Sequence, residues 1–150
     1  MDGIAFQSLD EFPLAWRWTR LEQDSLKPDV LADIRPLTIA SANRIAEEAR
    51  SRCAEAPIGE FAETWSAEWD DPDSVRSRLN KLGIDPSRRV FVSWSADMAL
   101  ETSWHTFVEY WEAFCYPSSD DVTIWTWEEP WSVCYRHFRV MQVRLPDRAI

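Results

Sequence analysis

The chain has 150 residues, of which 45% are hydrophobic and 28% charged, and its formal net charge is -10. This length is enough to bury a genuine core, so we expect residues 1–150 to form a single domain. The negative charge argues against nucleic acid or an anionic membrane as a partner and is compatible with a basic protein partner.

Side-chain patterns in the first third of the chain predict one strand and one helix. Residues 14–20 alternate between apolar and polar side chains, which predicts a strand with one aromatic face. Residues 21–36 carry two prolines and read mostly as a connection. Residues 37–54 are rich in alanine and place their apolar side chains on one side, so they predict an amphipathic helix.

The next part of the chain predicts two further helices. Phe61, Trp65 and Trp69 recur every fourth residue, which indicates a short helix. The dipeptide Asp71-Pro72 is typical of a helix start, with an N-cap carboxylate followed by proline in the first turn. Gly83 then suits the left-handed residue that follows a helix.

The second half of the chain reads as a strand, a helix and a hairpin. Residues 88–95 are β-branched and aromatic and predict a central strand. A helix follows, beginning between residues 96 and 102 and ending near Tyr116. Residues 122–127 and 131–145 predict two strands joined by a turn, the second with a bend near His137. We therefore expect an α+β fold, in which a small antiparallel sheet has helices packed on one face.

Acidic and basic residues are segregated along the chain. The stretch from Cys53 to Val75 holds seven carboxylates and no Lys or Arg, and the stretch from Val90 to Tyr135 holds eight and again no Lys or Arg. Each stretch also holds a pair of tryptophans, and tryptophan is enriched among interface hot spots. The alternative is that the carboxylates serve turns and solubility while the rings are half-buried core. The predicted partner-binding residues are Glu63, Trp65, Glu68, Trp69, Asp120, Asp121, Trp125, Trp127, Glu128 and Glu129.

The three cysteines are widely spaced, at Cys53, Cys115 and Cys134. An odd count without an export signal predicts reduced thiols, no disulfide and a cytoplasmic location. No close set of four zinc ligands occurs, so we expect neither a metal nor a cofactor.

Two other functions remain open beside a protein-binding role. The first is a small-molecule-binding domain, with an aromatic pocket near Trp104, Trp111 and the hairpin. The second is a hydrolase that uses Cys134 or His137, which requires a thiol and a base in contact within a cleft. The sequence contains no nucleophile elbow, phosphate loop or dinucleotide fingerprint, so we do not expect an enzyme.

The segment 90–140 contains VSWS, YPSSDDVTIW and YRHF. In these residues it resembles the C-terminal half of a group of short bacterial proteins without assigned activity. It is also similar to the small acidic immunity proteins of bacterial toxin systems, which often end in an aromatic hairpin. The resemblance implies a cytoplasmic protein that binds and neutralises a cognate toxin, and it assigns no individual residues.

Overall fold

The computed structural model describes residues 3–19, 26–53 and 63–144. Its centre is one seven-stranded sheet in the order β1-β4-β3-β5-β6-β7-β2, and every pairing between these strands is antiparallel. The strands are β1 (Arg35–Pro36), β2 (Glu63–Ser66), β3 (Arg89–Ser95), β4 (Met98–Ser103), β5 (Val122–Trp125), β6 (Ser132–Arg136) and β7 (Val140–Arg144). The antiparallel sheet and its covering helices confirm the α+β fold class.

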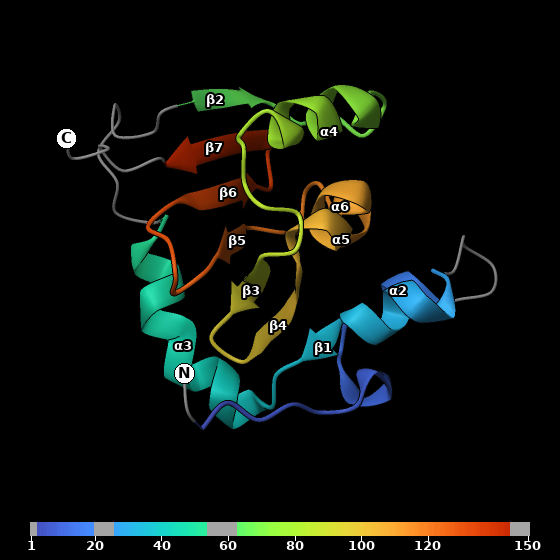
Figure 1. Cartoon of the computed structure of the whole chain (residues 1–150), viewed down its shortest axis with the longest axis vertical. Helices are drawn as coiled ribbons and strands as arrows, with labels where there is room; N and C mark the ends of the chain where they lie inside the picture. Colours follow the sequence, from blue (N-terminus) through green and yellow to red (C-terminus); the bar gives the residue numbers. More distant parts are fainter. Residues whose placement is uncertain (1–2, 20–25, 54–62, 145–150) are drawn as a thin grey trace.

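Helices cover both faces of this sheet (Figure 1). They are the 3-10 helix η1 (Leu9–Glu11) and the α-helices α1 (Trp16–Thr19), α2 (Pro28–Asp33), α3 (Ile39–Ser51), α4 (Pro72–Asn80), α5 (Trp104–Glu109) and α6 (Trp111–Phe114). Side chains that alternate along β3 enter two separate cores, because successive strand residues point to opposite faces. Phe91 packs with Ile45 of α3, whereas Val90 and Val92 pack with Phe107 and other residues of the larger core. Helix α3 therefore covers one face alone, which departs from the expected one-sided layering.

Two predicted helices and the predicted buried aromatic stripe are confirmed. The alanine-rich helix is α3, and its first turn is capped by the side chain of Thr38, which accepts a hydrogen bond from the backbone of Ser41. Helix α4 begins at Pro72 as predicted, and Gly83 has a φ of 74°. The aromatic stripe beneath the sheet is buried as expected, at Trp104, Phe107, Trp111 and Phe114.

Two predictions in the first half are wrong. The predicted strand 14–20 is not found in its described residues, 14–19, which include helix α1 instead. In this helix Trp18 is fully buried and donates its indole N–H to the carbonyl of Ala113. An apolar–polar alternation over so few residues does not distinguish the two-residue period of a strand from the period of about 3.6 residues of a helix. The predicted helix around Trp65 is strand β2. Residues four apart share a face in a strand as well as in a helix, so the spacing fits both structures. Pairing with β7 makes this segment a strand. Phe61 lies outside the described residues.

The second half also differs from the sequence reading in two places. The first part of the predicted helix is strand β4, which turns back on β3 so that Leu100 pairs with Val92. The helix after it is broken at Tyr110, whose φ and ψ are -119° and 30°. The long final strand is a hairpin of β6 and β7, and the bend near His137 is its turn, where Arg139 has a φ of 66°.

Candidate functional site

In the second acidic stretch, Asp120 is an internal residue. It is 7% exposed and forms a two-pronged ion pair with the buried Arg17, with Nη1–Oδ2 and Nη2–Oδ1 distances of 2.7 and 3.2 Å. The backbone N–H of Tyr116 also donates to Asp120, at 2.9 Å. The carboxylate is therefore fully engaged inside the protein, which argues against the prediction that it binds a partner.

The other three predicted binding carboxylates of this stretch, Asp121, Glu128 and Glu129, are at least partly exposed but already paired. Both Glu128 and Glu129 form ion pairs with Arg88. Asp121 accepts hydrogen bonds from the backbone and ring of His137, at 3.0 and 3.1 Å. Burial alone would raise the pKa of Asp121, but these bonds outweigh it and lower the pKa. A partner would have to compete with these internal contacts.

Of the two tryptophans predicted as binding residues in this stretch, only Trp127 reaches the surface. Trp125 is fully buried and packs against Phe91, with its indole N–H donating to Ser93 Oγ at 3.3 Å. Trp127 is 42% exposed and lies edge-on to Trp125, with ring centroids 4.9 Å apart. Burial therefore argues against the prediction of Trp125 as a binding residue, while Trp127 is accessible.

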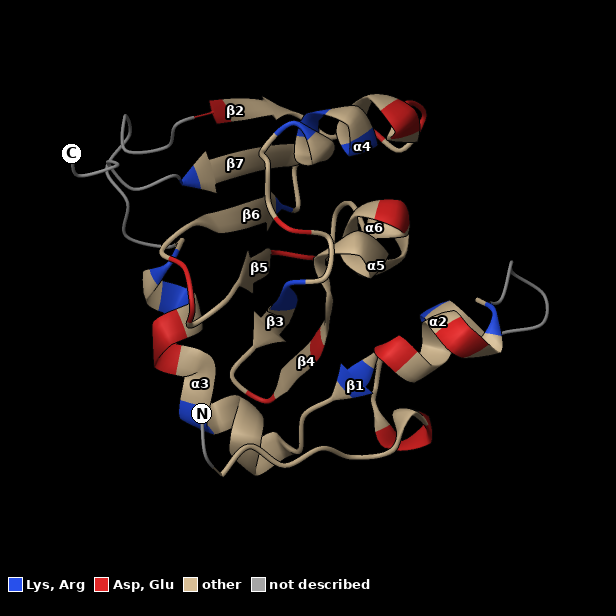
Figure 2. Ribbon diagram, viewed as in Figure 1, with Lys and Arg blue, Asp and Glu red and all other residues tan. Residues whose placement is uncertain are grey.

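The described part of the first acidic stretch has a different character, because four of its five carboxylates have no close ion pair among the described residues. Glu63, Glu68, Asp70 and Asp71 are all exposed. In the part of the chain that the structure describes, no cation is paired with Asp70 or Asp71, and Glu68 has only a long contact with Arg139, at 3.8 Å. Figure 2 shows acidic residues at the start of β2 and at the beginning of α4.

Three of these carboxylates, Glu68, Asp70 and Asp71, border an open groove of about 770 Å³ between β2 and α4. We call it the acidic groove; among its lining residues are Thr64, Ser66, Glu68, Asp70, Asp71 and Arg78. Trp65 also lines it, but this side chain is only 6% exposed and the Arg78 guanidinium lies 5.5 Å from its ring centroid. Trp65 is thus part of the groove wall, and its predicted role as a partner-binding residue stays a prediction.

Trp69 is the exposed ring beside the acidic groove, and it belongs to an aromatic cluster that the sequence did not reveal. Tyr116 lies between Trp69 and Trp16, with ring centroids 5.0 and 5.7 Å away. Trp69 is 41% and Trp16 37% exposed. The guanidinium of Arg17 lies 3.8 Å from the Tyr116 ring centroid, which fixes that ring in place. The three rings are far apart in sequence, so no local pattern predicts their meeting.

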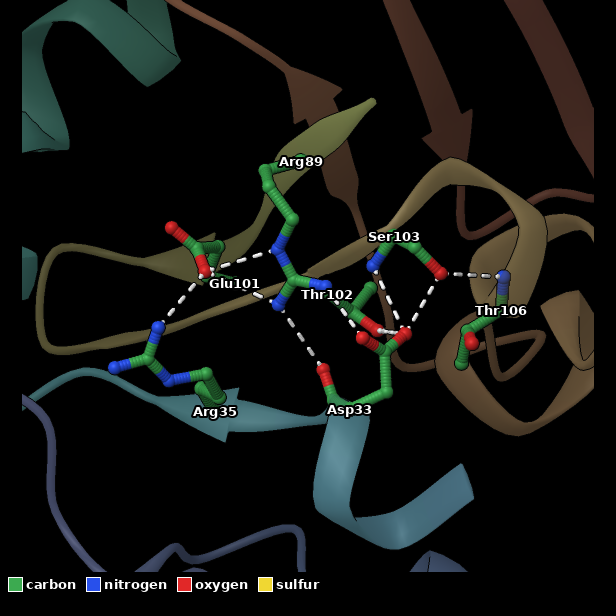
Figure 3. Close-up of polar contacts among 7 residues, drawn as sticks. All are labelled: Asp33, Arg35, Arg89, Glu101, Thr102, Ser103 and Thr106. Carbon is green, nitrogen blue, oxygen red and sulfur yellow. Dashed lines mark hydrogen bonds and ion pairs between the residues drawn. The ribbon is translucent and has the colours of Figure 1, made fainter. Parts of the chain in front are cut away.

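The densest polar network in the molecule surrounds Asp33 (Figure 3). One carboxylate oxygen accepts from Thr102 Oγ1 and from the backbone and hydroxyl of Ser103, at 3.1, 3.1 and 2.7 Å, while the other pairs with Arg89. Burial would raise the pKa of Asp33, but the bonds from Ser103 and Arg89 outweigh it and hold the pKa well below its usual range. Ser103 also caps α5 by accepting from Thr106 N–H. This network ties α2, β3, β4 and α5 together, which is a structural role.

The cysteines depart from the sequence reading. Cys53 and Cys134 form a disulfide, with Cα atoms 6.0 Å apart, so the prediction of three reduced thiols is wrong. Cys134 then has no thiol to act as a nucleophile. Cys115 is the free cysteine, and burial raises its pKa well above the usual range, which disfavours the reactive thiolate. Disulfides are rare in the cytosol, so the cysteine argument for a cytoplasmic location is lost.

The aromatic pocket expected near Trp104 and Trp111 is filled by side chains. Trp104 is 2% exposed and Trp111 is fully buried, and its indole N–H donates to the carbonyl of Pro72. A cavity of about 370 Å³ lies elsewhere, between α3 and the sheet, where Trp94 and Arg136 are among its lining residues. In residues 3–19, 26–53 and 63–144, no group of three or more His, Cys, Asp or Glu side chains is placed to hold a metal ion.

Within the same described residues, no helix has the length and apolar character needed to cross a bilayer. Comparison with protein-family models, with curated proteins and with solved structures finds no match to this chain.

Proposed function

We propose that the protein is an acidic binding protein that neutralises a basic protein partner, and that its binding face is the acidic groove together with Trp69. The observation that carries the proposal is the contrast between the two acidic stretches. Asp120, Asp121, Glu128 and Glu129 are occupied by internal partners. The carboxylates at the acidic groove are exposed and largely without such partners.

The chemistry of this face suits a cationic protein. Exposed carboxylates attract a basic partner over a distance and speed its association, particularly at low salt. An exposed tryptophan beside them supplies the apolar contact that slows dissociation. The net charge of -10 adds a long-range field of the same sign.

The biological role that we propose is immunity to a bacterial toxin in the cytoplasm, with a cationic, nuclease-like toxin as the partner. It rests on the similarity of residues 90–140 to the small acidic immunity proteins of bacterial toxin systems and on the charge of the acidic groove. The proposal assigns no catalytic residue and no cofactor to this chain.

Co-expression with the product of the neighbouring gene tests the proposal. We expect that product to arrest growth when it is expressed alone and to be harmless beside the wild-type protein. The triple variant Trp69→Ala/Asp70→Asn/Asp71→Asn should lose protection. Asparagine keeps the size of both carboxylates and remains a good residue before helix α4, so the fold should be preserved.

A matched control removes the same kind of charge from the other stretch. The variant Glu128→Gln/Glu129→Gln should protect as well as wild type, because these side chains already pair with Arg88. If the neighbouring product is harmless and immobilised wild-type protein captures no basic protein from source cells, the proposed function is refuted. Equal protection by the triple variant would refute the assignment of the binding face.

A further inference from the structure

Strand β2 is one edge of the sheet, and half of its backbone faces outward. Among the described residues it pairs with β7 alone, with Trp65 opposite Met141 and Ser66 opposite Val140. In the same register, the N–H of Ala67 donates to the carbonyl of Arg139 at 2.9 Å. Hydrogen-bonded positions alternate along an antiparallel strand, so the backbone of Trp65 also faces β7. The N–H and C=O groups of Thr64 and Ser66 therefore point away from the sheet.

These outward groups line the acidic groove. Among the described residues, no hydrogen bond occupies the backbone of Thr64 or Ser66. The indole N–H of Trp65, in the wall of the same groove, also has no acceptor there. Unpaired donors and acceptors along an edge strand are a template for another strand, and proteins usually protect them.

The opposite edge of the sheet, at strand β1, is protected in this way. Strand β1 has only two residues, and one of them is Pro36, which has no N–H to offer. A bridge between Phe6 and Leu37 continues beside it. Strand β2 has twice that length and no proline. The two edges of the sheet are therefore unequal, and the one that no described residue covers lies beside the acidic groove.

We propose that the partner's contact segment is an extended basic peptide that adds to β2 as a further antiparallel or parallel strand. This inference rests on the proposed function and specifies how the partner binds. The backbone of Thr64 and Ser66 supplies the hydrogen bonds that hold the segment. Its Lys or Arg side chains, which alternate along a strand, reach the carboxylates of Glu68, Asp70 and Asp71.

A synthetic peptide separates this mode from simple charge attraction. The probe is a capped six-residue peptide that alternates Arg and Val, titrated against the full chain by calorimetry. Two further peptides carry N-methyl groups on one or the other alternate set of residues, which removes their N–H donors without changing charge. We expect one N-methylated peptide to bind at least tenfold more weakly and the other to bind like the parent.

Variants of β2 provide the matched test on the protein side. Thr64→Pro removes an outward N–H and no bond to β7, so it should weaken peptide binding at least tenfold, while Thr64→Ala should leave it unchanged. Hydrogen exchange at the Ser66 amide should slow when the parent peptide is bound. If Thr64→Pro fails to fold, the N-methylated peptides and the wild-type protein still decide the question.

The outcomes separate this inference from the function on which it rests. If all three peptides bind with equal affinity and the Ser66 amide is not protected, strand addition is refuted. Salt-sensitive binding of these peptides is then still consistent with the proposed function. A parent peptide that does not bind at millimolar concentration also overturns strand addition. Only the co-expression and capture experiments can refute the proposed function itself.

Discussion

The buried ion pair between Arg17 and Asp120 offers the sharpest test of the structure. Their side chains are 4% and 8% exposed, so Arg17→Met leaves a carboxylate inside the protein without its cation. Removing one member of a buried, hydrogen-bonded pair costs about 3–5 kcal/mol. Arg17 also stacks on Tyr116, and losing this contact places the expected cost toward the upper part of that range.

The double variant Arg17→Met/Asp120→Leu is the matched control, because it removes both charges and keeps an apolar filling. The Tyr116 N–H then loses its acceptor, which costs about 1–3 kcal/mol, so the double variant should be more stable than Arg17→Met. Urea unfolding curves measure both changes through the midpoint and slope. A loss below about 1 kcal/mol for Arg17→Met, or a double variant less stable than the single one, would refute the burial of this pair.

Three further outcomes are expected. Trp111→Ala should lower the free energy of unfolding by about 3–5 kcal/mol, and a urea-measured loss below about 1 kcal/mol would contradict the buried stripe. Unfolded protein without reductant should show one reactive thiol, Cys115, and three after reduction; three before reduction would exclude the disulfide. The lowered pKa of Asp33 means that its contribution to stability is present above the ordinary pKa of about 3.8 and is lost as pH falls toward the folded value. Asp33→Asn should therefore flatten the fall of stability below about pH 4 in acid-unfolding curves, and an unchanged slope would count against the network.

Elements whose signal is local were predictable from the sequence. Helix α3 has alanine-rich periodicity, and β3 has a run of β-branched and aromatic residues. Helix α1 could not be predicted because a contact distant in sequence stabilises it: Arg17 pairs with Asp120, which is 103 residues away. Strand β2 was missed because its partner β7 lies late in the chain, and the short run around Trp65 is ambiguous without it.

Only part of the candidate site could be predicted from the sequence, because its contacts join residues that are far apart in the chain. Counting charges located the acidic stretches but could not tell which carboxylates meet cations inside the fold. Arg88 lies outside the stretch that contains Glu128 and Glu129, yet it pairs with both. Likewise, Trp69 gains significance only when Trp16 and Tyr116 come together around it.

The position of β2 at the edge has a consequence for how the protein is made. β2 leaves the ribosome long before β7, and β7 is the only strand that holds it within the described residues. Until residues 140–144 have been synthesised and folded back through the turn at Arg139, no described strand is available to pair with β2. The ordered edge beside the acidic groove is therefore completed late in synthesis. A nascent chain halted before β7 would carry Asp70 and Asp71 but would not yet present them beside an ordered edge.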